Sequence, residues 1–230
     1  MTQANEAEIY KEIKQAIIQQ KLRPNIQLVE DVIAESFGVS RTPVRNVLRR
    51  LAYEKLVKII PHKGTFVSCP TVEEAKEVFE MRRVLEADGI RKACSRLTEK
   101  QFQQLKSLLH EEHELHDKGD LLGALQISGD FHLKIAKIAG NSYYYRYLEE
   151  LVSLTYVIIA FYGQRQQLTF CRDNEHEQIL NAMKRQDEKL AERLMLEHLT
   201  HIEKNLDFDE TFATPMSLAD IFKVRVDSSL

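Results

Sequence analysis

The 230-residue sequence contains no tryptophan and few helix-breaking residues, with eight glycines and five prolines. This scarcity excludes the turn-rich pattern of an all-β protein and favours a mainly α-helical chain. Three widely spaced cysteines exclude a disulfide framework and favour a reducing cytoplasm. The chain shows no signal-peptide pattern, and its longest apolar stretch, residues 154–162, is too short to cross a bilayer. We therefore expect no membrane partner.

Charge is distributed unevenly along the chain. Residues 1–70 contain eleven Lys and Arg against seven Asp and Glu, a net of +4. The remaining residues contain 21 against 28, a net of −7. A basic first third on an acidic body indicates a local anionic partner such as nucleic acid.

The segment "SRTPVRNVLRRL", residues 40–51, concentrates this positive charge. Arg41, Arg45 and Arg49 recur every four residues, so they lie along one side of a helix, and Thr42 stands in its first turn. Apolar residues occupy the other side: Val44, Val47, Leu48 and Leu51. This pattern predicts a helix that packs on a core and presents arginines to a phosphate-lined groove.

The N-terminal third predicts helices at 6–20, 29–37 and 41–54, then two short strands around a turn at 61–64. This order is typical of a winged helix-turn-helix, whose third helix enters the DNA major groove. We assign residues 1–70 to this DNA-binding domain.

The rest of the chain shows no convincing strand pattern. Periodicity and capping boxes predict six helices at 72–94, 98–117, 120–139, 142–165, 171–185 and 187–206. We assign 71–206 to an all-helical bundle that binds an effector or forms a dimer, and 207–230 to an extension with a short helix or partial disorder. The segment 143–163 is apolar nearly all round, which fits a central bundle helix, a dimer surface or both.

The quoted motifs resemble a known family. "SRTPVR", "LRRL" and "KGTFV" are similar in content and order to the winged helix of GntR-family bacterial transcription regulators. "MRRVLE", "DFHLKIAKIAGN", "EHEQIL" and "AERLMLEHL" resemble the FadR-type effector domain called FCD. Asn46 stands where the family usually has an acidic residue and Lys55 where it has glycine; neither departure removes a DNA-facing arginine.

The resemblance implies a set of DNA contacts. Arginine bonds guanine O6 and N7 or clamps a phosphate, and helix-start N–H groups hold phosphate. The predicted DNA-binding residues are Arg41, Thr42, Arg45, Arg49 and, at the wing tip, His62, Lys63 and Gly64. The alternative for an isolated run of arginines is a solvated basic helix.

Three histidines lie on the inward faces of three predicted helices: His132, His176 and His198. Each alone is more typical of a satisfied core histidine, but together they form a candidate metal site. The resemblance implies a divalent metal held by three histidines and one Asp or Asn. Ser128 occupies that fourth position here, and Asp130 should point elsewhere. Three histidines suit zinc or nickel, and no Glu or Asp base is predicted beside them.

Two further residues are candidates for effector binding. Arg82 lies on an inward helix face, where it either pairs with Glu86 one turn on or, as the resemblance implies, clamps an effector carboxylate. Asn141 follows Gly140 and either is only a helix C-cap or, as the resemblance implies, contacts the effector. The cluster "HEEHELH" at 110–116 has the wrong spacing for HExxH chemistry and is interpreted as a polar helix end.

We therefore expect a homodimeric transcription regulator, not an enzyme, in the bacterial cytoplasm at the nucleoid. It would bind double-stranded DNA at a near-palindromic operator, and a small carboxylate effector would relieve repression. One alternative is a metal-dependent hydrolase fused to a DNA-binding domain. The other is a DNA-binding protein with a ligand-free structural bundle.

Overall fold

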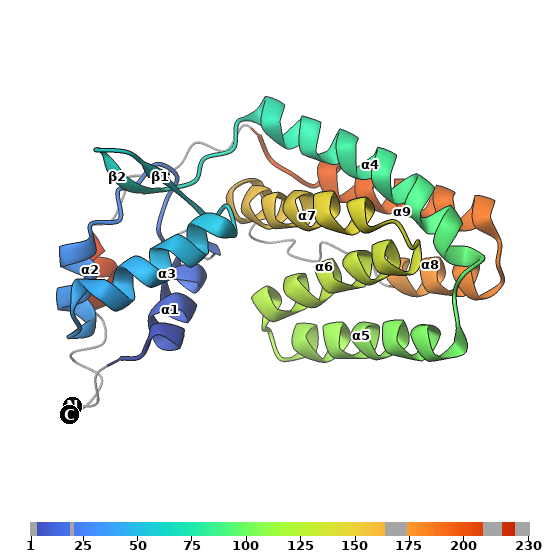
Figure 1. Cartoon of the computed structure of the whole chain (residues 1–230), viewed down its shortest axis with the longest axis horizontal. Helices are drawn as coiled ribbons and strands as arrows, with labels where there is room; N and C mark the ends of the chain where they lie inside the picture. The colour runs from blue at the N-terminus through green and yellow to red at the C-terminus, as the bar shows by residue number, and fades with distance from the viewer. Residues whose placement is uncertain (1–3, 19–20, 164–173, 209–217, 224–230) are drawn as a thin grey trace. The chain divides into compact units, whose positions relative to one another are not determined.

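The computed structural model describes residues 4–18, 21–163, 174–208 and 218–223. This part of the chain contains ten helices and one two-stranded sheet (Figure 1). The mainly α-helical class expected from the sequence is confirmed. No helix in the described ranges combines the length and hydrophobicity that a bilayer crossing requires.

The N-terminal region folds as three helices followed by a hairpin. Its elements are α1 (Glu6–Ile18), α2 (Glu30–Phe37), α3 (Arg41–Tyr53), β1 (Val57–Ile60) and β2 (Gly64–Val67). The strands are antiparallel, with Val57 opposite Val67 and Ile60 opposite Gly64. This order confirms the winged helix-turn-helix predicted from the sequence.

The amphipathic pattern of α3 determines how it is seated. Its apolar side is buried and packs on α1: Val44, Val47, Leu48 and Leu51. The preceding helix α2 is followed by the C-cap residue Gly38, whose left-handed φ of +64° costs glycine little energy. The chain therefore turns sharply between α2 and α3. Because the apolar side of α3 is the buried one, its arginine side stays exposed.

The rest of the chain forms the helical bundle. Its helices are α4 (Val72–Cys94), α5 (Glu99–Asp117), α6 (Leu121–Ile138), α7 (Ser142–Tyr162), α8 (Glu175–Lys184) and α9 (Glu188–Lys204). α4 packs along α9, and α5 packs along α6. One apolar core joins α4, α5, α6, α8 and α9. The predicted capping box at the start of α5 is confirmed, with Thr98 and Gln101 bonding each other's backbone N–H.

Two predicted helix ends need correction. α7 ends at Tyr162, because Gly163 already bridges to Leu206; the rest of its predicted extension, 164–165, lies outside the described residues. The eighth helix begins at Glu175, and the predicted start at 171–173 also lies outside them. The same holds for positions 19–20 of the first predicted helix.

Contacts divide the chain into two units. The first comprises Met1–Thr71, Val157–Tyr162 and Asp209–Leu230, and the second comprises Val72–Tyr156 and Gly163–Phe208. The domain limits expected from the sequence stay predictions.

The first unit includes a helix from the C-terminal extension. α10 (Leu218–Lys223) packs on α2, where the rings of Phe222 and Phe37 lie 5.4 Å apart. Phe222 is buried. Part of the extension therefore belongs to the core of the winged-helix unit.

Candidate functional site

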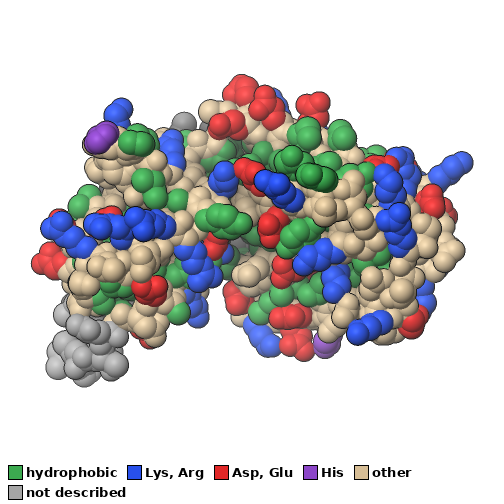
Figure 2. Space-filling model, viewed as in Figure 1, with side chains coloured by type: hydrophobic (Ala, Val, Ile, Leu, Met, Phe, Trp, Pro, Cys, Tyr) green, Lys and Arg blue, Asp and Glu red, His purple; other side chains and the backbone are tan. Residues whose placement is uncertain are grey.

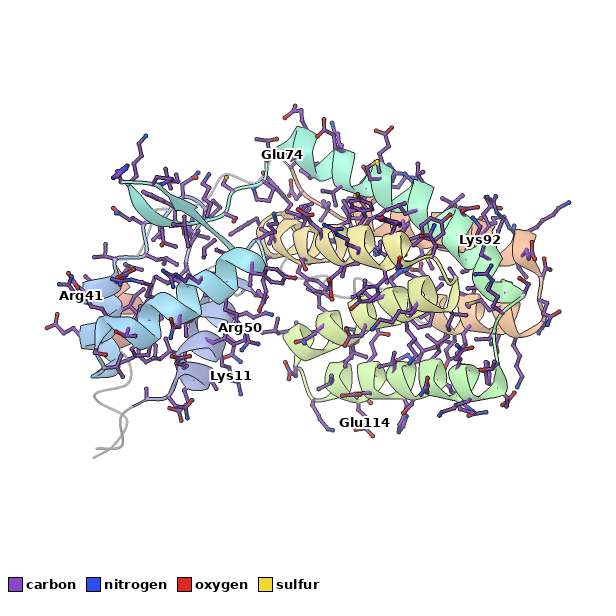
Figure 3. All side chains as sticks on the ribbon, viewed as in Figure 1. Lys11, Arg41, Arg50, Glu74, Lys92 and Glu114 are labelled. Atoms are coloured by element: carbon purple, nitrogen blue, oxygen red, sulfur yellow. The ribbon has the colours of Figure 1, made fainter. Side chains whose placement is uncertain are left out.

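The arginine side of α3 faces solvent. Arg41, Thr42, Arg45 and Arg49 are all exposed. Lys and Arg side chains gather over this part of the winged helix in Figure 2, and Figure 3 shows Arg41 and Arg50 towards opposite ends of α3. The structure therefore brings the predicted helix residues onto one accessible face, while their DNA contacts stay predictions.

Two of these arginines pair with acidic residues of α2. Arg45 Nη2 lies 2.8 Å from Glu30 Oε2, and Arg45 Nε lies 3.2 Å and 3.3 Å from the two Glu30 oxygens. Arg41 forms a second ion pair with Asp31. The hydrogen bond from Arg45 outweighs partial burial and lowers the pKa of Glu30, so this carboxylate is ionised at neutral pH. Neither ion pair was predicted from the sequence.

The wing tip is a tight, exposed turn. Lys63 N–H donates to Ile60 C=O at 3.0 Å, and His62 has a left-handed φ of +61°. Gln27 donates its side-chain amide to Lys63 C=O at 2.9 Å. His62, Lys63 and Gly64 are therefore presented together to solvent, as a DNA-contacting wing requires.

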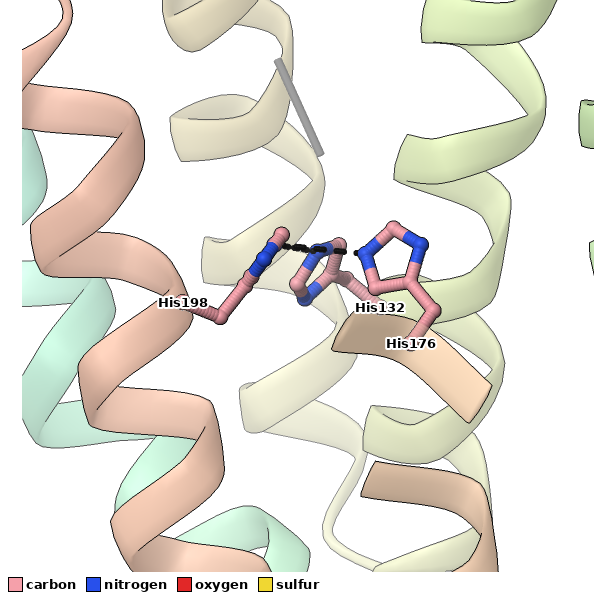
Figure 4. Close-up of side chains that lie close together, drawn as sticks. All are labelled: His132, His176 and His198. Atoms are coloured by element: carbon pink, nitrogen blue, oxygen red, sulfur yellow. Dashed lines mark hydrogen bonds between the residues drawn. The ribbon is translucent and has the colours of Figure 1, made fainter. Parts of the chain in front are cut away.

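The second candidate site lies inside the bundle. His132 of α6, His176 of α8 and His198 of α9 are at most 4% exposed, and their rings point toward one another (Figure 4). The Nε2 atoms of His176 and His198 are 3.2 Å apart, and those of His198 and His132 are 3.3 Å apart. Three helices thus bring three ring nitrogens to one point, and all potential ligand atoms lie within 4.8 Å of one another.

Each histidine has a carboxylate on its other ring nitrogen. The Nδ1–oxygen distances are 2.5 Å from His132 to Glu86, 2.9 Å from His176 to Glu112 and 2.8 Å from His198 to Glu175. A carboxylate accepts hydrogen bonds, so each Nδ1 carries the proton and each Nε2 keeps its lone pair. Three lone pairs therefore face one another at the centre of the cluster.

Burial favours the neutral form of the His132 and His198 rings. Burial lowers the pKa of His132, although Glu86 partly offsets it. Burial and the neighbouring His176 and His132 hold the pKa of His198 well below its usual range. Burial raises the pKa of Glu86, but Arg82 and His132 overcome this effect and lower it to about 2. At neutral pH the site thus combines neutral rings of His132 and His198 with an ionised Glu86.

This arrangement fits a divalent metal ion. A tetrahedral site with metal–nitrogen distances of about 2.0–2.1 Å has nitrogens about 3.3 Å apart, which matches the distances from His198 Nε2 to the Nε2 atoms of His176 and His132. Glu86, Glu112 and Glu175 together with Arg82 leave a formal charge of −2, which a divalent cation neutralises. The residues thus offer three ligand nitrogens and the complementary charge.

The position of the usual fourth ligand is occupied by a buried serine. Ser128 lies one turn before His132 on the same face of α6. Asp130 is exposed, in agreement with the expectation that it points elsewhere. α6 continues as an α-helix through Gly129, so no distortion redirects Asp130. The protein supplies three nitrogen ligands and no carboxylate in the place of Ser128.

Arg82 lies beside the histidine cluster. Its contacts agree with a pair to Glu86 and leave a donor for an effector carboxylate. Its Nε donates to Glu86 at 2.7 Å and its Nη1 to Thr155 at 3.3 Å. Its Nη2 is buried and has no hydrogen-bond partner within the described chain. The pair with Glu86 thus exists, while one donor stays free to bind an added acceptor.

Asn141 has a local role at the surface. It is exposed, and its side-chain oxygen accepts from Tyr143 N–H at 3.0 Å at the start of α7. The C-cap of α6 is Ala139, so the predicted C-cap role of Asn141 is wrong. A contact between Asn141 and an effector stays a prediction.

The three glutamates that bond to the histidine rings were not predicted from the sequence, which offered no Glu or Asp base beside the histidines. Glu112 was missed within "HEEHELH", although Phe102, Leu105 and Leu109 precede it on the buried side of α5. Glu175 directly precedes His176 and bonds to His198 across two helices. A glutamate at the end of an apolar stripe was the available signal for Glu112.

An exposed basic helix in a winged helix, together with a helical bundle that buries three histidines, is typical of a DNA-binding regulator. A family model described as "Bacterial regulatory proteins, gntR family" matches residues 5–67, and one described as "FCD domain" matches 77–201. The chain therefore belongs to the GntR family of bacterial regulatory proteins and carries an FCD domain.

Similar proteins agree with this placement. The chain is 25% identical over 209 residues to the HTH-type transcriptional repressor RspR of Escherichia coli K12, covering 89% of this chain and 90% of that one. It is 28% identical over 195 residues to the Uxu operon regulator of Haemophilus influenzae, covering 77% and 72%. The solved E. coli McbR/YncC shares the fold, with a TM-score of 0.63, 20% identity and coverage of 87% and 95%. The protein is a DNA-binding transcription regulator.

Proposed function

We propose that the protein acts as a homodimeric, cytoplasmic repressor whose operator affinity falls when a small carboxylate binds in the bundle. Members of the family bind DNA and usually act as dimers, and the similar RspR is named a repressor. Two winged helices related by a two-fold axis would read the half-sites of a near-palindromic operator. The choice of repression over activation rests on the similarity to RspR.

The observation that carries the sensor proposal is the convergence of three Nε2 lone pairs. His132, His176 and His198 would hold one divalent ion, zinc or nickel, and their glutamate partners would fix the rings. A metal held by three nitrogens supplies open coordination positions for oxygen donors.

Arg82 supports a carboxylate as the effector. Its unpartnered Nη2 offers a buried, charged donor. A ligand carboxylate would satisfy this donor with a charge-assisted hydrogen bond. The pair with Glu86 keeps the guanidinium in place before the ligand arrives.

Elemental analysis of untagged protein purified without chelator tests the metal. We expect about one zinc or nickel ion per chain, which His132→Ala abolishes. His110→Ala, on an exposed histidine, is the matched control and keeps the metal. Absence of metal from the wild type after zinc is added back would contradict the metal site.

Calorimetric titration of zinc-loaded protein with citrate and L-malate tests the effector class. Arg82→Lys retains the charge but loses the forked donor, so we expect at least about tenfold weaker binding. Arg83→Lys, at the next position of α4, is the control and binds as the wild type does. Equal affinity of Arg82→Lys and wild type would remove Arg82 from the site.

DNA binding is tested with duplexes that the wild-type protein selects from a random-sequence pool. Arg45→Ala should weaken binding to them about ten- to hundredfold. Arg50→Ala, also on α3 but paired with Glu54, loses the same charge and serves as the control. Unchanged affinity of Arg45→Ala would refute the assignment of Arg45.

The hydrolase alternative gains little from the geometry. Glu86, Glu112 and Glu175 each accept from a ring nitrogen, so none is free as a base for water. Turnover of ester or phosphoester substrates that His132→Ala abolishes would revive this alternative.

A further inference from the structure

Glu30 holds one edge of the Arg45 guanidinium. Its carboxylate lies against Nε and Nη2, at 3.2 Å and 2.8 Å. This is the side edge of the arginine fork, and the two groups meet in the two-pronged geometry of a strong arginine–carboxylate pair. The contact joins α2 to the exposed side of α3.

The opposite edge of the same guanidinium is left for another acceptor. Arginine has five N–H donors, and the pair with Glu30 uses one on Nε and one on Nη2. Within the described residues no acceptor bonds to Nη1. The end edge, formed by Nη1 and the outer N–H of Nη2, matches guanine O6 and N7 in the major groove.

We infer that Glu30 is a positioning residue that makes Arg45 read a base instead of clamping a phosphate. This inference rests on the proposed DNA contact of Arg45. Glu30 fixes the plane and direction of the guanidinium before DNA arrives, which reduces the rotamer freedom lost on binding. A carboxylate beside the guanidinium also repels a phosphate that approaches the same arginine.

Arg49 provides an internal contrast. It lies one turn after Arg45 on the same side of α3, is exposed, and has no ion pair among the residues that the structure describes. An exposed arginine without an ion pair suits a phosphate, whose position varies little with base sequence. Of these two arginines, Arg45 is held for base readout and Arg49 is left for the backbone.

The test compares sequence preference rather than affinity alone. Wild type and the variants Arg45→Ala, Arg49→Ala, Glu30→Gln and Glu35→Gln each select duplexes from the same random-sequence pool, which is then sequenced. Glu35 is exposed on α2 and has no ion pair in the described chain, so Glu35→Gln matches the charge change of Glu30→Gln. Thermal unfolding of each variant checks folding.

We expect Arg45→Ala to abolish the preference at particular base pairs, and Glu30→Gln to reduce the preference at the same base pairs about tenfold. Affinity of Glu30→Gln for an unselected duplex should rise, because a negative charge is lost near the phosphates. Arg49→Ala should weaken binding to all duplexes alike, and Glu35→Gln should keep the wild-type preference.

Two outcomes would overturn the inference. If Glu30→Gln binds all duplexes more tightly with an unchanged preference, Glu30 only competes with DNA. If its preference and affinity both equal those of Glu35→Gln, the ion pair has no role in recognition. A different result, in which Arg45→Ala keeps every base preference, would instead refute the proposed DNA contact of Arg45.

Discussion

The winged helix and the bundle each pair an arginine with a glutamate at similar distance but under opposite exposure. Arg45 Nη2 lies 2.8 Å from Glu30, with side chains 50% and 30% exposed. Arg82 Nε lies 2.7 Å from Glu86, with both side chains 3% exposed. Water screens the first pair, whereas the second lies where an unpaired charge is strongly disfavoured.

The difference shows what each arginine is able to do. Because its ion pair contributes little to stability, Arg45 keeps most of its donors available to DNA at small cost. Arg82 cannot leave Glu86 without an uncompensated buried charge, so a ligand must come to it. The exposed pair orients an arginine that DNA can reach from solvent, and the buried pair holds an arginine inside the bundle.

The largest effect is expected from breaking the buried pair. Glu86→Ala leaves the Arg82 guanidinium unpaired and removes the partner of His132, so the free energy of unfolding should fall by about 3–5 kcal/mol. Denaturant unfolding monitored by circular dichroism measures it. The control is Glu203→Ala, which breaks the partly exposed pair with Arg83 and should cost less than about 1 kcal/mol. Equal losses would erase the distinction between buried and exposed pairs.

Metal removal should affect the bundle and spare the winged helix. If the histidines hold zinc, stripping it should lower the free energy of unfolding by about 3–4 kcal/mol at a 100- to 1,000-fold excess over Kd. Hydrogen exchange followed by mass spectrometry should show faster exchange in α6, α8 and α9 after chelation, with α3 unchanged. Equal acceleration in α3 would show that metal also stabilises the DNA-binding helix.

A smaller effect should follow from filling the contact between α6 and α7. A Cβ on Gly129 would lie 2.8 Å from Val152 Cγ1 and closer still to the Tyr156 hydroxyl. Gly129→Ala should therefore cost about 1–3 kcal/mol of stability. Gly89→Ala is the control, since its Cβ meets only Tyr144 at 3.7 Å and alanine favours a helix. A stable Gly129→Ala would indicate that α7 moves away from α6 easily.

Much of the candidate site could be predicted from the sequence because its residues follow helical periodicity. Each of the three histidines, His132, His176 and His198, shares a helix face with apolar residues at helical spacing. The sequence therefore predicted that they point into the bundle. Their convergence was suggested by the family resemblance, because periodicity does not tell which helices meet.

The carboxylate partners depended on packing between helices. Glu112 meets His176 and Glu30 meets Arg45 only because α5 approaches α8 and α2 approaches α3. No local pattern encodes these approaches. The same limit explains why the end of α7 was predicted too late. Its apolar sequence gives no sign of the bridge between Gly163 and Leu206 that follows its last turn.

The smallest effect on folding is expected at Glu30. Glu30→Gln removes one side of an exposed ion pair, so its unfolding midpoint should stay within experimental error of the wild type. The pKa of Glu30 is lowered by Arg45, so the ion pair stabilises the folded state at neutral pH. This small stabilisation should disappear in acid, where the carboxylate is protonated. Thermal unfolding at neutral and acidic pH measures both. A stability loss close to that of Glu86→Ala would mean that the α2–α3 pair is a structural support, and a changed DNA preference in that variant would then report misfolding instead of a misdirected arginine.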